Sequence, residues 1–282
     1  MGTNPMSELI ELVNSEASRL GEFLSQLDEA SWSRDSACEG WKVGDVLGHL
    51  ASGGATWANS ITRAINGDAG PPEGGAFLQP GERGSSTIAQ AAIAINQEMG
   101  TKLLETFSEG YDRLRQVMAG LTAEDWDKPC FHRRGPIPVR DYVGVRLQEL
   151  TVHGWDIRSG LDEKAELSQE PLADLVGRVP RWLSNAFRPG LDLPAPTRYR
   201  FQVTSPVPVA EDILVNRDSY RVEPVEPSGS GQADVTFGCD TGNYILLIYG
   251  RLDVDRAVAS GRLSVEGPKD LAANFTSWFE GF

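Results

Sequence analysis

The sequence predicts a multidomain fold in which a four-helix bundle is followed by a smaller α+β domain. The chain has 282 residues, which is enough for two domains of ordinary size. Apolar residues recur at helical spacing in four separate segments between residues 7 and 159. From residue 197 onward the chain contains shorter runs of β-type residues that are separated by turn residues. These three observations define the expected architecture.

Four helices are expected in the first domain. Apolar spacing predicts them at residues 7–27, with Ser7 as the N-cap, and at 42–65, 87–119 and 139–159. The pair Gly53-Gly54 is the expected weak point of the second helix, because glycine lowers helix stability. Residues 67–86 are rich in glycine and proline, which predicts a long loop and a candidate cover for an active site. Four helices with one long insertion are typical of a bundle.

The second domain is expected to begin after a connection. An acidic helix near residues 170–187 and the proline-rich stretch that follows it predict a connecting helix and linker over 166–196. The bundle would then span 7–165 and the α+β domain 197–282. In the latter, strands are expected at 199–204, 212–216, 220–225, 233–237 and 263–266, and helices near 241–249, 254–259 and 268–279.

The composition excludes some classes of partner. A formal net charge of −14 opposes binding to nucleic acid or to an anionic membrane, since both need a positively charged face. Cys38, Cys130 and Cys239 are far apart, so no disulfide framework is predicted. Because a signal-peptide pattern and a long apolar run are both missing, the sequence predicts a cytoplasmic protein.

Three residues on two of the predicted helices have the pattern of a metal site. Glu149 and His153 are four residues apart, so their side chains lie on one helix face, one turn apart. His49 lies among apolar residues on the second helix, which should pack against the fourth. Two imidazoles and a carboxylate suit zinc with one open coordination position, and they also suit non-haem iron. Asp45 and Asp156 are within helical reach of the two histidines and are expected to accept hydrogen bonds from them.

The same residues also have simpler explanations. A glutamate and a histidine four residues apart are common as a surface ion pair, and a single histidine on an apolar face is usually a core residue. The convergence of all three on adjacent helices favours the metal. An open coordination position could hold water or a thiol, and a bound thiol would ionise to the reactive thiolate.

Two segments resemble the metal-binding signatures of the mycothiol-dependent maleylpyruvate isomerase family. They are GWKVGDVLGHL at residues 40–50 and ELTVHGWD at residues 149–156. The resemblance implies a DinB-like four-helix bundle over roughly residues 7–160, with zinc bound by His49, Glu149 and His153. Residues 253–267 are similar to the end of the α+β domain of that family, which implies a sterol-carrier-like second domain.

The resemblance also implies thiol chemistry. The family includes isomerases that add a thiol reversibly to a double bond, as in a maleylpyruvate-like acid, and transferases that attach mycothiol or a related thiol to an electrophile. The implied partners are a low-molecular-weight thiol and an electrophilic or carboxylate small molecule. Because the family uses a soluble thiol, the resemblance also implies that the three cysteines pack as small apolar residues. In the isomerase an arginine of the second domain reaches toward the active site, which makes Arg262 the first catalytic candidate and Arg251 the second.

A basic loop before the fourth helix is a candidate for binding an anionic substrate or cofactor. It contains His132, Arg133 and Arg134, whose charges would offset the acidic character of the chain. A plain surface loop is the alternative. For the whole chain, the alternative to an enzyme is a non-catalytic protein that binds a small molecule or lipid and has a structural metal. Helices at 241–249 and 268–279 would then line an apolar tunnel.

Overall fold

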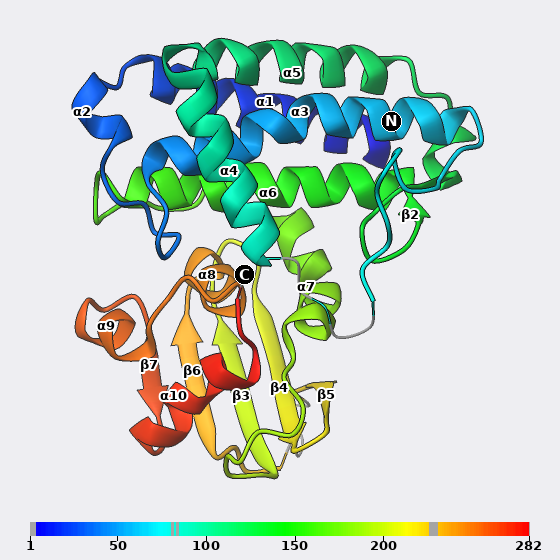
Figure 1. Cartoon of the computed structure of the whole chain (residues 1–282). Helices are drawn as coiled ribbons and strands as arrows, with labels where there is room; N and C mark the ends of the chain where they lie inside the picture. Colours follow the sequence, from blue (N-terminus) through cyan, green and yellow to red (C-terminus); the bar gives the residue numbers. More distant parts are fainter. Residues whose placement is uncertain (1–3, 80–81, 83–84, 226–230, 282) are drawn as a thin grey trace. The chain divides into compact units, whose positions relative to one another are not determined.

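The computed structural model describes residues 4–79, 82, 85–225 and 231–281. The chain divides into two compact units, Met1–Glu166 and Leu167–Phe282 (Figure 1). Among the described residues, no helix combines the length and the apolar character needed to cross a membrane. Part of the loop expected at 67–86 lies outside the described residues, and its described part contains no helix or strand before residue 85.

The first unit contains the predicted four-helix bundle. Its helices are α1 (Pro5–Ser25), α3 (Val43–Ile65), α5 (Leu103–Ala119) and α6 (Val139–Ser159). Helix α1 packs against α5 and α6, and α3 packs against the same two helices, so the four form a closed ring of contacts (Figure 1). Helix α1 buries an apolar stripe of Leu9, Val13, Leu20 and Leu24, whereas α6 is buried over most of its length. This arrangement places α3 and α6, which carry the predicted ligands, side by side.

The bundle begins three residues earlier than its apolar spacing predicts. Asn4 is the N-cap of α1, because its side-chain oxygen accepts a hydrogen bond from the backbone N–H of Met6 at 3.1 Å. Pro5 occupies the first turn, where its missing N–H costs nothing. The prediction of Ser7 as the cap was therefore wrong.

The single helix predicted at 87–119 is divided into three pieces. Helix α4 (Ser85–Met99) ends at a short 3₁₀ helix, η1 (Gly100–Lys102), and α5 then begins at Leu103. Gly100 has a φ of +49°, a left-handed conformation that glycine adopts without steric cost. Because of this break, α4 leaves the direction of α5 and crosses α3 instead (Figure 1). Helical periodicity alone does not reveal a break that one glycine makes.

Glycines of α3 allow two neighbouring helices to approach its backbone closely. A Cβ added at Gly48 would lie 2.6 Å from the carbonyl oxygen of Ala92 on α4. One added at Gly54 would lie 2.9 Å from the carbonyl carbon of Gly110 on α5. The glycines that weaken α3 as an isolated helix are thus the points where α4 and α5 pack against it.

We expect Gly48→Ala to destabilise the first unit by about 1–3 kcal/mol, since the new methyl group would overlap a backbone oxygen that cannot rotate away. Gly21→Ala is the matched control, because the methyl group there would make an ordinary 3.8 Å contact with Phe107. The control should be neutral or slightly stabilising. Urea unfolding followed by circular dichroism measures both variants. Equal stability of the two would contradict the close packing of α4 on α3.

The second unit is an α+β fold built on a five-stranded sheet. The strand order is β5 (Ser219–Pro224), β4 (Val209–Asn216), β3 (Thr197–Val203), β6 (Val235–Cys239) and β7 (Ser264–Glu266). Strands β3 and β6 are parallel, and all other neighbours are antiparallel. The helices are α7 (Leu172–Ala186), α8 (Thr241–Ile248), α9 (Val254–Ala259) and α10 (Lys269–Trp278). Helix α7, expected to be part of a connection, packs against α8 within this unit.

Aromatic side chains fill the core of the second unit. Phe275 of α10 contacts the rings of Tyr199, Phe201 and Phe237, with ring centroids 5.2–5.6 Å apart. All four side chains are fully buried. On α8, residues 245–248 are buried as well. The helices that were expected to line an apolar tunnel therefore supply packed core residues.

Candidate metal centre

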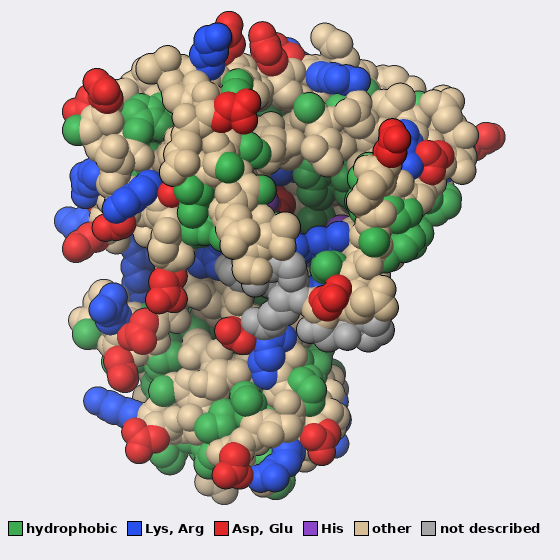
Figure 2. All heavy atoms as spheres, in the orientation of Figure 1, with side chains coloured by type: hydrophobic (Ala, Val, Ile, Leu, Met, Phe, Trp, Pro, Cys, Tyr) green, Lys and Arg blue, Asp and Glu red, His purple; other side chains and the backbone are tan. Residues whose placement is uncertain are grey.

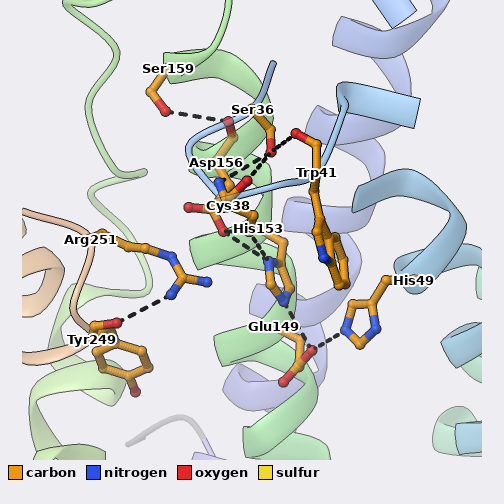
Figure 3. Close-up of polar contacts among 10 residues, drawn as sticks. All are labelled: Ser36, Cys38, Trp41, His49, Glu149, His153, Asp156, Ser159, Tyr249 and Arg251. Carbon is orange, nitrogen blue, oxygen red and sulfur yellow. Dashed lines mark hydrogen bonds and ion pairs between the residues drawn. The ribbon is translucent and has the colours of Figure 1, made fainter. Parts of the chain in front are cut away.

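His49, Glu149 and His153 converge between α3 and α6. The Nε2 atom of His49 lies 2.7 Å from Oε2 of Glu149, and Nε2 of His153 lies 3.4 Å from the same oxygen. One donor atom from each residue lies within 4.8 Å of the other two. Figure 3 shows the two imidazoles pointing toward the carboxylate from different helices. The structure thus brings together the three residues that the spacing singled out.

The spacing of this donor set is close to what a tetrahedral metal requires. Ligand atoms at about 2.0–2.1 Å from zinc are about 3.3 Å from one another. The observed separations of 2.7 and 3.4 Å lie on either side of that value, so small side-chain shifts would complete the geometry. Two imidazole nitrogens and one carboxylate oxygen are also chemically suitable ligands. The residues present therefore fit a divalent metal with a fourth position left for another ligand.

Asp156 orients one of the two histidines, as expected from the sequence. Nδ1 of His153 donates a hydrogen bond to Oδ2 of Asp156 at 2.8 Å (Figure 3). The Asp156 side chain is fully buried, which restricts its movement. Because Nδ1 is held in this way, Nε2 of His153 faces Glu149 and is available to bind a metal.

Asp45 has a different role from the one predicted. Its Oδ2 atom accepts a hydrogen bond from the backbone N–H of Lys42 at 2.8 Å, which fixes the start of α3. Its Oδ1 atom accepts a hydrogen bond from Asn96 of α4, also at 2.8 Å. The prediction that Asp45 accepts from His49 was wrong, because both carboxylate oxygens are directed to the helix terminus and to α4.

The loop at residues 33–42 covers His153 on two sides. The Trp41 ring stacks on the imidazole of His153 with an interplanar angle of 12°. The Cys38 thiol donates a hydrogen bond to Oδ2 of Asp156 at 3.0 Å (Figure 3). Cys38 was expected to be a small apolar filler, so that prediction was wrong. Its position two residues before the GWKVGDVLGHL signature was the only sequence signal for this contact.

Charge interactions within the triad hold its carboxylate in the ionised form. Burial would raise the pKa of Glu149, but hydrogen bonds from His153 and His49 outweigh it and hold that pKa well below its usual value. Burial likewise opposes the charged form of His153, yet the hydrogen bond to Asp156 raises the pKa of His153 well above its usual value. A metal ligand must be a neutral imidazole, so metal uptake would release a proton from His153 and become more favourable as pH rises.

Sequence reasoning missed a buried arginine, Arg146, which lies on α6 one turn before Glu149. Arg146 is 1% exposed, and its Nη2 donates a hydrogen bond to the carbonyl oxygen of Leu50 at 2.9 Å. Its guanidinium carbon lies 5.4 Å from the ring centroid of Trp57 and 4.9 Å from that of Tyr111. A Cβ at Gly53 would lie 2.8 Å from Nη1, so this glycine leaves the space that the guanidinium occupies.

The charge of Arg146 is not balanced by an ion pair. Among the described residues no carboxylate lies within ion-pair distance of it, and its Nε atom has no hydrogen-bond partner. Burial lowers the pKa of Arg146 to about 10, and the negative charge of Glu149 opposes that shift. The guanidinium therefore keeps its positive charge at neutral pH, close to the triad.

The predicted basic loop forms the tip of a two-stranded hairpin that leads into α6. Its strands are β1 (Pro129–Cys130) and β2 (Ile137–Pro138). At the tip, the backbone N–H of Arg134 donates a hydrogen bond to Nδ1 of His132 at 3.3 Å. The exposed side chain of Arg134 donates to the carbonyl oxygen of Glu82 at 3.4 Å. The binding role expected of His132 and Arg134 stays a prediction.

Arg133 of this loop interacts electrostatically with Glu149 of the triad. Its side chain is partly buried and has no hydrogen bond or ion pair to any described residue. Burial lowers the pKa of Arg133, and the negative charge of Glu149 opposes this effect. Its backbone carbonyl accepts a hydrogen bond from the backbone N–H of Leu78 at 2.8 Å, which fixes the hairpin to the preceding loop.

On the first unit, Figure 2 shows a hollow in which histidine and Lys or Arg side chains are visible.

Both arginines predicted as catalytic residues lie in the second unit. Arg251 lies three residues after the end of α8, and its Nη1 donates a hydrogen bond to the carbonyl oxygen of Tyr249 at 3.3 Å (Figure 3). Arg262 lies in the turn after α9, where its backbone N–H donates to the carbonyl of Ala257. Both side chains are partly exposed. Their role in catalysis stays a prediction.

Comparison with known proteins supports the resemblance drawn from the two signatures. The family model for the mycothiol maleylpyruvate isomerase N-terminal domain matches residues 13–158, and the model for the SCP-2 sterol transfer family matches residues 195–280. A crystal structure of the mycothiol-dependent maleylpyruvate isomerase is 18% identical, with a TM-score of 0.62 over 95% of this chain and 98% of that chain. A structure of that isomerase with one histidine replaced by alanine is 17% identical, with a TM-score of 0.61 over the same shares. No curated protein matches the sequence.

Proposed function

Because the chain belongs to the mycothiol maleylpyruvate isomerase N-terminal domain family, we propose that it is a metal-dependent enzyme that activates a low-molecular-weight thiol. The metal is proposed to be zinc, bound by His49, Glu149 and His153. The observation that carries this proposal is the convergence of these three side chains, whose donor atoms lie within 4.8 Å of one another. Zinc is preferred because two imidazoles, one carboxylate and one open position form a typical catalytic zinc site.

Each residue around the triad has a defined part in this proposal. The bound metal supplies a Lewis acid that lowers the pKa of a thiol and so provides the nucleophilic thiolate. Asp156 holds His153 in the orientation required of a ligand. Trp41 covers His153 and lies 5.8 Å from the ring of His49, which keeps water from that side of the site.

The reaction that follows is addition of the thiol sulfur to an electrophilic carbon of a small molecule. In an isomerase, a carbon–sulfur bond forms at a conjugated double bond, the former double bond rotates as a single bond, and the carbon–sulfur bond breaks again. In an S-transferase, the carbon–sulfur bond is retained, and either the neighbouring carbon takes up the proton that the thiol lost or a leaving group departs with the electron pair of its bond. The thiol is proposed to be mycothiol or a similar small thiol, since the structural relatives at 95% coverage are named as mycothiol-dependent.

Metal content and thiol binding test this function. We expect about one equivalent of metal per chain in the purified wild type and far less in a His49→Ala variant. Titration of the cobalt-substituted protein with mycothiol should then produce a sulfur-to-cobalt absorption band. If the wild type contains no stoichiometric metal, the proposal fails. If the metal is present but its removal unfolds the bundle and mycothiol gives no band, the metal is structural.

We further propose that Arg133 binds an anionic group of the electrophile. Replacement of Arg133 with glutamine should raise the KM for a carboxylate electrophile by about 10-fold or more, because one charge-assisted hydrogen bond is lost. The KM for an uncharged electrophile should change little. Arg134→Gln is the matched control, since its side chain is exposed and bound to a loop carbonyl. Equal effects of the two substitutions on the carboxylate substrate would contradict the assignment.

A further inference from the structure

Arg146 is a buried cation whose presence the fold does not explain. Its guanidinium lies between the rings of Trp57 and Tyr111 and makes one hydrogen bond, to the carbonyl oxygen of Leu50. An uncharged side chain of similar length would fill the same space without the cost of removing a charge from water. The Nε donor, buried and without a partner among the described residues, adds to that cost.

The position of Arg146 relates it to both helices that carry the triad. It precedes Glu149 by three residues on α6, so the two side chains share one helix face. Its hydrogen-bond acceptor, Leu50, directly follows His49 on α3. The positive charge of Arg146 therefore lies close enough to act electrostatically on the triad.

We propose that Arg146 is a specificity-determining charge of this site, buried so that an anionic ligand, the thiolate, is favoured over a neutral ligand at the triad. This inference rests on the proposed function and extends it. A nearby positive charge attracts a thiolate, and the low dielectric of the bundle interior strengthens that attraction. The same charge repels a divalent metal. Removal of the charge should therefore weaken thiolate binding without weakening metal binding, whereas removal of a structural residue would weaken both.

The first measurement compares metal and thiol affinities in the metal-loaded protein. Arg146→Met removes the charge at similar length, and Arg146→Lys retains it. For Arg146→Met we expect mycothiol to bind about 10-fold more weakly or worse, while the metal binds as tightly as in the wild type or more tightly. Arg146→Lys should bind mycothiol within about threefold of the wild type. A parallel loss of metal and thiol affinity, or an unchanged thiol affinity in Arg146→Met, would overturn the proposal.

The second measurement needs neither metal nor thiol. In urea unfolding of the metal-free protein, we expect the midpoint of Arg146→Met to equal or exceed that of the wild type, because the buried charge serves the ligand and not the fold. A clearly lower midpoint would show that the charge supports the bundle, and the inference would then be wrong. Absence of stoichiometric metal in the wild type would instead refute the proposed function, and the unfolding result would still decide whether the charge is structural.

Discussion

Replacement of Glu149 with glutamine is expected to weaken metal binding by more than about 100-fold, the largest effect among the substitutions considered. Glu149 is the only anionic member of the triad, and its Oε2 atom faces Nε2 of both His49 and His153. Glutamine has the same shape but offers a neutral oxygen. Substitutions that only disturb the support of a metal ligand already cost about 10–100-fold in affinity, and a direct charged ligand contributes more.

Competition with a chelator of known affinity measures this effect. Glu39→Gln is the matched control, because Glu39 is an exposed residue on the loop that covers the site and its replacement removes the same charge. The control should bind metal within about twofold of the wild type, since solvent and salt screen the charge of an exposed side chain. Metal affinity in Glu149→Gln that equals the control would remove Glu149 from the ligand set.

The metal-free protein provides a second readout of Glu149. The hydrogen bonds that depress the pKa of Glu149 stabilise the folded state above pH 4.5, the ordinary value for this carboxyl group. That contribution is lost as the pH falls toward the depressed value. The Glu149→Gln variant lacks this titration, so its stability should depend less on pH below pH 4.5 than that of the wild type.

Local periodicity was sufficient to predict the bundle and its candidate ligands. Glu149 and His153 share a face because any two helical residues four apart do so, whatever surrounds them. His49 could be added because the helix that contains it has an apolar face that must pack against a neighbour. Both inferences need only the helical repeat, which a single sequence displays directly.

The residues that sequence reasoning missed depend on packing between distant segments. Arg146 looks like an ordinary surface arginine in sequence, and its burial depends on Gly53 leaving room for it on another helix. Cys38 contacts Asp156 only because the loop at 33–42 returns to the end of α6. The break between α4 and α5 depends on the backbone conformation of Gly100. Such features arise from tertiary structure, so no local pattern predicts them.

Asp156→Asn is expected to weaken metal binding by about 10–100-fold at pH 8 and to do so less at lower pH. The carboxylate of Asp156 holds Nδ1 of His153 at 2.8 Å, and an amide in its place accepts that hydrogen bond less strongly. The imidazole would then be a poorer ligand and less firmly oriented. Asp162→Asn is the matched control, because Asp162 is exposed just after α6 and its carboxylate accepts a hydrogen bond from the backbone N–H of Lys164.

The pH dependence follows from the proton that competes with the metal for His153. Burial opposes protonation of His153, but Asp156 raises its pKa well above the usual value, so in the wild type protons begin to displace the metal at a comparatively high pH. Without the Asp156 carboxylate the pKa of His153 falls, and proton competition begins only at a lower pH. The affinities of wild type and Asp156→Asn should therefore approach each other as the pH is lowered. Chelator competition at several pH values measures this convergence, and a constant ratio of the two affinities across the range would show that Asp156 does not act through His153.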